Sequence, residues 1–185
     1  KGMANGKNRL NTIYISRRLQ ECLRPISYYA MTTVTAPMGY GKTTAIDWYL
    51  TKQLKEEQAV LIRISIYSDN LSIFWKSVQN AFSFAGLDFL KDYECPEDEA
   101  SAGFLMDLLC HSLACDRIYY IFIDDFHLLT DKRVTEFLYI LTNRLPSNIH
   151  LVVASRNHFL LGEEIVRLGG KLYQIGEEQL RLQQD

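Results

Sequence analysis

The segment at residues 36–44 reads A-P-M-G-Y-G-K-T-T and limits the possible folds of this chain more than any other feature. An apolar run at residues 28–35 precedes it, and a helical pattern at residues 44–54 follows it. A loop of this composition between a strand and a helix is the usual context of a phosphate-binding loop. Gly39 and Gly41 carry no Cβ, so the backbone can turn tightly there and approach an anion. The segment therefore predicts a phosphate-binding loop of the Walker A type.

The residue types in this loop suit a nucleotide. Backbone N–H groups at the start of the following helix can hold phosphate oxygens. Lys42 supplies a cation to the β- and γ-phosphates, and the Thr43 hydroxyl is placed to bind Mg²⁺. Ala36 stands where the strict pattern has its first glycine. The alternative is a glycine-rich turn before a helix, with a lysine there by chance. The residues expected to contact the nucleotide are Pro37, Met38, Gly39, Tyr40, Gly41, Lys42, Thr43 and Thr44.

A second signal is the apolar run at residues 119–123, which ends in Asp124 and Asp125. Ligands of open α/β sheets lie at the carboxyl ends of the strands. Asp124 at that edge is expected to hold Mg²⁺ directly or through water. Asp125 is then free to orient or deprotonate an attacking water. Because strands often end in Asp for turn formation, a plain turn is the alternative interpretation.

A third signal is the apolar run at residues 149–154, which is followed by Ser155 and Arg156. An arginine at this edge can reach the γ-phosphate and sense whether it is present. The alternative is an arginine held in a surface ion pair. His127 lies two residues past the carboxylate pair and either faces the site or starts a helix.

Composition excludes several classes of protein. The chain has 185 residues, a length that suits one domain with a substantial core. Its formal net charge of −2 gives no general attraction to nucleic acid, so no DNA binding by this segment is expected. No apolar run is long enough to cross a membrane. We expect residues 1–16 to be a flexible lead-in and residues 17–185 to be the nucleotide-binding domain.

The cysteines and the acidic stretch have simpler interpretations than a metal site. None of the four cysteines forms a C-x-x-C pair, and Cys110 with Cys115 fits zinc spacing poorly. Cys110 and its neighbour His111 lie in an apolar helical stretch, where a packed thiol is expected. We therefore expect four reduced thiols and a cytoplasmic protein. Residues 91–100 are acidic and contain Pro96, which favours an exposed loop over a metal or partner site.

Apolar runs alternate with helical patterns along the chain, which is typical of a layered α/β domain. Several of the runs are continuous, as in parallel strands covered on both faces. The expected strands are residues 29–35, 60–65, 118–123, 149–154 and 171–175. The expected helices are residues 17–23, 43–54, 73–84, 102–114, 134–144 and 160–168. A strand at residues 60–65, between the phosphate loop and Asp124 in sequence, indicates the additional-strand class, in which another strand separates these two in the sheet. The predicted fold is thus a three-layer P-loop NTPase fold with a mostly parallel five-stranded sheet.

Together these motifs resemble the nucleotide-binding domain of STAND ATPases, in particular the large LuxR-family activators of the maltose-activator type. The loop follows the family pattern A-P-x-G-Y-G-K-T-T. The D-N-x-x-x-F-W run stands at residues 69–75, and the D-D-x-H-x-L signature at residues 124–129. Residues 145–156 and 179–182 resemble two later stretches of the same family. Met38, Phe126 and residues 157–159 depart from the family pattern.

The resemblance implies a molecular switch that is a fragment of a larger regulator. Family members rest with ADP bound, exchange it for ATP when an inducer binds, self-associate, and activate transcription through a C-terminal helix-turn-helix. In this chain it implies ATP or ADP with Mg²⁺, and Lys42 and Arg156 as contacts of the γ-phosphate. The inducer and DNA sites are expected in other domains. The sequence contains no clear motif for recognition of the nucleotide base, and residues 17–19 are candidates for contact with adenine.

Two other functions remain open on sequence grounds. One is a free-standing P-loop kinase that phosphorylates a small molecule, although no arginine cluster follows the Asp124 strand to form its lid. The other is an interaction domain whose nucleotide is structural. The leading expectation is an ATP/ADP-binding module with slow ATP hydrolysis.

Overall fold

Continuous apolar runs form the centre of the sheet. Every residue of β3 (Tyr119–Asp124) and of β4 (Ile149–Ser155) is buried, because helices cover both faces of these strands. The computed structural model describes residues 15–37 and 41–181. The remaining strands are β1 (Met31–Thr35), β2 (Val60–Ser65) and β5 (Leu172–Ile175). Each strand lies within two residues of its predicted range.

The strand order is β2-β3-β4-β1-β5, and every neighbouring pair is parallel. β4 therefore lies between β1, which leads into the phosphate loop, and β3, which ends at Asp124. This arrangement confirms the additional-strand class and the five-stranded α/β fold. The strand that separates β1 from β3 is β4, whereas β2 forms an edge of the sheet.

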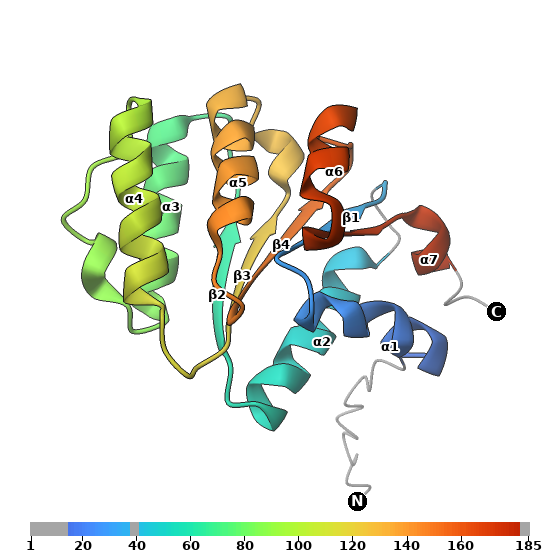
Figure 1. Cartoon of the computed structure of the whole chain (residues 1–185). Coiled ribbons are helices and arrows are strands. Elements are labelled where there is room, and N and C mark those ends of the chain that lie inside the picture. The colour runs from blue at the N-terminus through green and yellow to red at the C-terminus, as the bar shows by residue number, and fades with distance from the viewer. Residues whose placement is uncertain (1–14, 38–40, 182–185) are drawn as a thin grey trace, which may run out of the picture.

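Helices form the outer two layers (Figure 1). The α-helices are α1 (Arg17–Leu23), α2 (Lys42–Glu56), α3 (Leu71–Phe84), α4 (Glu99–Ser112), α5 (Lys132–Arg144), α6 (Gly162–Leu168) and α7 (Glu177–Arg181). Short 3-10 turns are η1 (Arg24–Ser27), η2 (Asp88–Leu90), η3 (Phe126–Leu128) and η4 (Gly169–Lys171). The helices α3, α4 and α5 begin two or three residues before their predicted starts, because the side chains of Asn70, Asp98 and Asp131 cap them. The helix α7 was not predicted.

Two hydrophobic clusters hold the layers together, one on each face of the sheet. Trp75 and Phe82 of α3, Leu109 of α4 and Leu138 of α5 pack on one face. Leu23 and Leu50, from α1 and α2, pack on the other face with Phe122 and Val152. Burial of this apolar surface on both faces is the main stabilising contribution.

The residues directly before α1 are part of the folded domain. Residues 1–14 of the expected lead-in lie outside the described residues, while Ile15 is buried and Ser16 caps α1.

Residues 91–98 form the expected loop, and most of them are exposed. The carbonyl oxygen of Tyr93 accepts hydrogen bonds from Trp75 Nε1 at 2.9 Å and Gln79 Nε2 at 2.8 Å, which attach this loop to α3.

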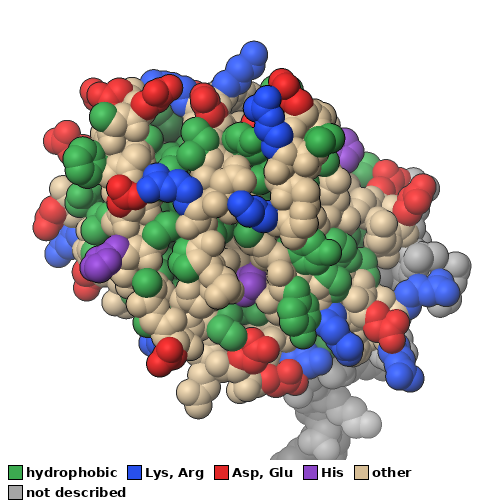
Figure 2. Space-filling view, in the orientation of Figure 1, with side chains coloured by type: hydrophobic (Ala, Val, Ile, Leu, Met, Phe, Trp, Pro, Cys, Tyr) green, Lys and Arg blue, Asp and Glu red, His purple; other side chains and the backbone are tan. Residues whose placement is uncertain are grey.

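Acidic and basic side chains are interspersed over the face seen in Figure 2, in keeping with the formal net charge of −2. None of the helices in the two described ranges combines the length and the hydropathy needed to span a bilayer. All four cysteines lie in these ranges and none forms a disulfide.

A buried network of polar side chains lies on the face of the sheet that α2 covers. The hydroxyl of Ser27 contacts Tyr49 and bonds Tyr120 at 2.8 Å. His150 stacks on Tyr120 with ring centroids 5.3 Å apart, and its Nδ1 donates to the carbonyl oxygen of Tyr29 at 2.8 Å. Burial lowers the pKa of His150, because the imidazolium form is poorly solvated there.

We predict that His150 makes an unfavourable contribution to stability at pH 5.5 that is absent at pH 7.5, and that His150→Phe removes this contribution. In the unfolded chain His150 takes up a proton as the pH falls below its ordinary pKa of 6.5. In the folded chain its pKa is lower, so His150 stays neutral at pH values where the unfolded chain is protonated. Asp69, Asp98 and Asp131 have lowered pKa values, so their contribution is lost only near and below pH 4. Urea unfolding at both pH values measures the effect. An equal pH dependence in the variant and the wild type contradicts this role.

Candidate nucleotide site

The carboxyl ends of β1, β3 and β4 lie at one end of the parallel sheet, where Pro37 follows β1, Asp124 ends β3 and Arg156 follows β4. Ala36 and Pro37 follow β1, and α2 begins at Lys42. Met38, Gly39 and Tyr40 lie outside the described residues, and so does the side chain of Lys42. Thr43 and Thr44 form the first turn of α2.

Gly41 sets the entry into α2. Its φ of +66° lies in the left-handed region, which a glycine adopts without a Cβ clash. The N–H of Ala45 then donates to its carbonyl oxygen at 3.0 Å. Glycine has no side chain to cap the helix, and the first turn carries no acidic residue. The N–H groups of this turn therefore have no side-chain cap from Gly41, which favours an anion at this helix end.

The two predicted metal ligands lie next to each other. The hydroxyl of Thr43 is 3.2 Å from Oδ2 and 3.4 Å from Oδ1 of Asp124, although the two residues come from α2 and β3. Asp124 is buried, with 7% of its surface exposed. A hydroxyl and a carboxylate are hard oxygen donors of the kind that Mg²⁺ prefers. The donor set therefore fits this ion.

Asp125 turns the chain sharply after β3. Its φ of 57° and ψ of 38° are left-handed, a conformation that Asp tolerates better than most residues. Its N–H donates to Oδ1 of Asp124 at 2.9 Å, and its carbonyl oxygen accepts from the N–H of Leu128 at 3.0 Å. Two hydrogen bonds thus fix its backbone beside the predicted metal ligand.

Arg156 is linked to the same turn through His127. The backbone N–H of Arg156 donates to Nδ1 of His127 at 3.2 Å, so this nitrogen carries no proton in that contact. The side chain of Arg156 is exposed and forms no ion pair with any residue that the structure describes. The surface ion pair considered from the sequence is thus not seen among the described residues. Sequence reasoning left the direction of His127 open.

A carboxylate outside the predicted set fixes the far end of the same loop. Asp69, between β2 and α3, accepts from the N–H of Thr130 at 2.7 Å and from its hydroxyl at 2.6 Å. These bonds lower the pKa of Asp69 by favouring its charged form. The next residue, Asn70, caps α3 by accepting from the N–H of Ile73 at 3.0 Å. The D-N-x-x-x-F-W run was the only sequence signal for this attachment.

A second missed carboxylate lies near Asp124. Asp47, four residues after Thr43 on α2, forms an ion pair with Arg63 at 2.6 Å. Burial raises the pKa of Asp47, Arg63 opposes that rise, and the charge of Asp124 adds to it. The Arg63 guanidinium lies 5.4 Å from the centre of the Phe122 ring. Arg63 thus offsets part of the negative charge beside the predicted metal ligand.

The candidates for adenine contact lie in α1. Leu19 is buried in the core and is not available to a ligand, whereas Arg17 and Arg18 are exposed. Arg17 lies 3.8 Å from Glu21.

The fold and this cluster can be compared with known proteins. A model of the AAA domain family matches residues 26–160. The chain belongs to the AAA domain family. The HTH-type transcriptional regulator MalT of Vibrio campbellii is 23% identical over 190 aligned residues, which cover 93% of this chain and 19% of that protein. MalT of Yersinia pestis (strain Pestoides F) is 27% identical over 182 residues, with the same coverage. The chain thus spans about a fifth of the length of these relatives.

Solved structures show the same fold. Cdc6p from Pyrobaculum aerophilum matches with a TM-score of 0.56 and 16% identity, covering 89% of this chain and 47% of that one. The Drosophila ORC bound to DNA has a chain that matches with a TM-score of 0.55 and 17% identity, covering 85% of this chain and 40% of its own. These matches confirm the fold. The family model and the MalT relatives confirm the predicted resemblance to a P-loop ATPase domain of the MalT type.

We predict that Gly41→Ala lowers the free energy of unfolding by about 1–2 kcal/mol, because alanine is strained at this left-handed φ. Gly103→Ala in α4 is the matched control. Its Cβ meets no atom within 4 Å, and removing a glycine from a helix interior stabilises by about 1 kcal/mol. Urea unfolding of both variants gives the comparison. Equal stability of Gly41→Ala and the wild type contradicts the required conformation.

Proposed function

We propose that this domain binds ATP or ADP with Mg²⁺ at the sheet edge and hydrolyses ATP slowly. The contact between the Thr43 hydroxyl and the buried Asp124 carboxylate carries this proposal, because it joins the phosphate loop to the β3 carboxylate. Such a pairing of oxygen donors at a helix N-terminus suits a metal-bound polyphosphate.

The phosphates are bound by the loop and the start of α2. Backbone N–H groups of the first turn, from Lys42 to Thr44, donate to phosphate oxygens, and the positive end of the helix dipole adds to the attraction. Lys42 supplies a full charge at the β- and γ-phosphates. Pro37, Met38, Gly39, Tyr40 and Gly41 complete the cradle.

Thr43 and Asp124 hold Mg²⁺, which supplies positive charge to the phosphates when it is bound. Asp125 orients or deprotonates the attacking water, and the hydrogen bonds on its N–H and carbonyl groups support a fixed position for it. Arg156 contacts the γ-phosphate and stabilises its charge. The link from His127 to the Arg156 backbone supports a common position for the β3 and β4 loops.

The domain serves as the nucleotide-dependent switch of a signal-responsive transcriptional regulator. Support comes from its similarity to MalT, which is named an HTH-type transcriptional regulator. On this proposal, residues 17–185 are the nucleotide-binding module, other domains are its partners, and it self-associates in a nucleotide-dependent way. A γ-phosphate held by Lys42 and Arg156 biases the arrangement of neighbouring domains. The module itself binds no DNA.

We predict that Lys42→Ala lowers the affinity for both ATP and ADP by about tenfold or more, because a charge at the phosphates is lost. Lys52→Ala is the matched control, since Lys52 lies on the same helix and is paired with Glu56 at 3.9 Å. Isothermal calorimetry with nucleotide-stripped protein and Mg²⁺ measures both variants. If the wild type binds neither nucleotide, the proposed function fails.

We also predict that Asp125→Asn keeps ATP affinity within about twofold but lowers the rate of phosphate release by about 10²-fold or more, because the general base is lost. The metal ligand Asp124 remains in this variant. Phosphate release and transfer of labelled phosphate to small acceptors are measured in parallel. Unchanged turnover contradicts the role of Asp125, and transfer to an acceptor instead of water supports a kinase.

A further inference from the structure

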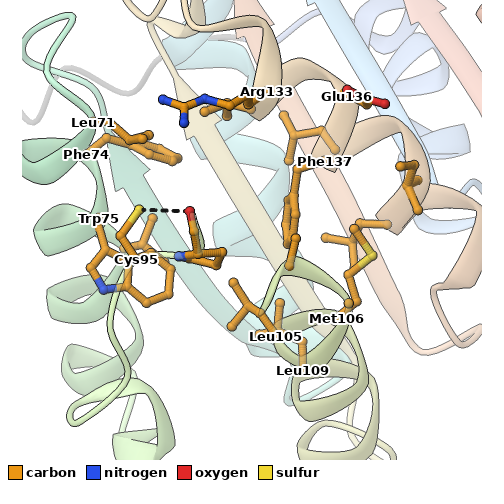
Figure 3. Close-up of a pocket in the computed structure, with 18 of the residues that line it drawn as sticks. Leu71, Phe74, Trp75, Cys95, Leu105, Met106, Leu109, Arg133, Glu136 and Phe137 are labelled. Carbon is orange, nitrogen blue, oxygen red and sulfur yellow. Dashed lines mark hydrogen bonds between the residues drawn. The ribbon is translucent and has the colours of Figure 1, made fainter. Parts of the chain in front are cut away.

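A large pocket lies between the helices α3, α4 and α5 and the sheet (Figure 3). Its volume is about 730 Å³. Ile64 of β2, Ile121 and Ile123 of β3, and Leu151 of β4 form its floor. Pro37, Gly41, Thr43 and Asp124, which are described residues of the predicted nucleotide site, are not among the residues that line it. Because α2 lies on the opposite face of the sheet, this pocket is separate from the nucleotide site (Figure 1).

Apolar side chains from all three helices form the walls. Trp75 of α3, Leu105 and Met106 of α4, and Phe137 of α5 point into the space (Figure 3). The indole N–H of Trp75 already donates to the carbonyl oxygen of Tyr93 at 2.9 Å, so it offers no donor to the interior. Protein cores pack with few voids larger than a water molecule, whereas ligand pockets occupy roughly 300–1,000 Å³. The size and the lining are those of a pocket for an apolar ligand.

The charges around the pocket are mainly acidic. Four of the residues that line it are carboxylates: Glu97, Asp98, Glu99 and Glu136. Glu97, Glu99 and Glu136 form no ion pair with any residue in the described ranges. An approaching ligand thus meets uncompensated negative charge.

The two basic residues in the described lining of the pocket are already paired with carboxylates. Arg133 is paired with Asp131 at 2.7 Å, and Arg144 is paired with Asp107. Neither of these aspartates lines the pocket. Among the described residues that line the pocket, an acidic ligand therefore meets no unpaired cation, whereas a basic group meets three carboxylates without an ion pair.

With a volume of about 730 Å³, the pocket lies within the size range of small-molecule sites. We propose that it binds a small molecule with an apolar body and one basic group, the body resting on the sheet and the basic group beside the carboxylates.

Dansylcadaverine and dansyl-6-aminohexanoate test this proposal, because they share the dansyl group and the five-carbon chain and differ only in the charge of the end group. We expect dansylcadaverine to bind the wild-type chain about tenfold more tightly than the acid, with increased and blue-shifted fluorescence. Failure of the amine to bind overturns the proposal. Equal affinity for the two probes overturns the assignment of a basic ligand.

Variants that fill the pocket test whether dansylcadaverine binds there. Ala102→Trp and Gly103→Leu change residues that line the pocket and fill its space, so we expect each to weaken dansylcadaverine binding about tenfold. Gly103→Leu also removes a glycine from α4, which favours folding. Ala100→Trp, an exposed site outside the lining, is the control that keeps wild-type affinity. Full binding by both filled variants overturns the location.

Further variants test the carboxylate of Glu136 and the independence of the pocket from the nucleotide site. Glu136→Gln is expected to reduce the preference for the amine about threefold, whereas Glu178→Gln, exposed in α7, leaves it unchanged. An unchanged preference in Glu136→Gln contradicts the role of this carboxylate. Lys42→Ala is expected to bind dansylcadaverine like the wild type, so the pocket is tested independently of the nucleotide site. Loss of amine binding in this variant contradicts the separation of the two sites.

Discussion

The proximity of the Thr43 hydroxyl and the Asp124 carboxylate depends on the order of the strands. These groups come from α2 and β3, and β4 lies between β3 and the strand that leads into α2. Their contact at 3.2 Å is possible because all the strands run in the same direction and end at one edge. A buried carboxylate needs a partner, and a hydroxyl donor meets part of that need. The predicted nucleotide site is thus a consequence of the parallel sheet.

The loops around this edge are attached to one another rather than independently placed. Asp69 holds the chain at Thr130, and His127 holds the backbone of Arg156. Both links converge on the segment that follows Asp124. A shift of this segment therefore changes several potential ligand contacts together, which is a property expected of a switch element. The β3 residues Ile121 and Ile123, which precede this segment, form part of the floor of the apolar pocket.

The sequence predicted the parts of the molecule that depend on local pattern. Continuous apolar runs identified the strands. The glycine-rich loop after β1 and Asp124 at the end of β3 located the predicted nucleotide site at the carboxyl ends of these strands. Helix starts were less accurate, because Asn70 and Asp98 act as caps ahead of the first apolar residue. The bond between Asp69 and Thr130 depends on a contact between distant segments, and only the D-N-x-x-x-F-W run pointed to that attachment. The pocket under α4 and α5 also depends on contacts between distant segments, and one sequence carries no signal for it.

The central place of β4 has a consequence for the order in which the protein can assemble during synthesis. Its two neighbours, β1 and β3, are hydrogen-bonded to it and not to each other. A nascent chain that has not yet delivered residues 149–155 to the tunnel exit has no template on which to bring these two strands into one sheet. The predicted nucleotide site, although its phosphate loop is encoded earlier, is therefore completed only after the middle of the sheet has been translated.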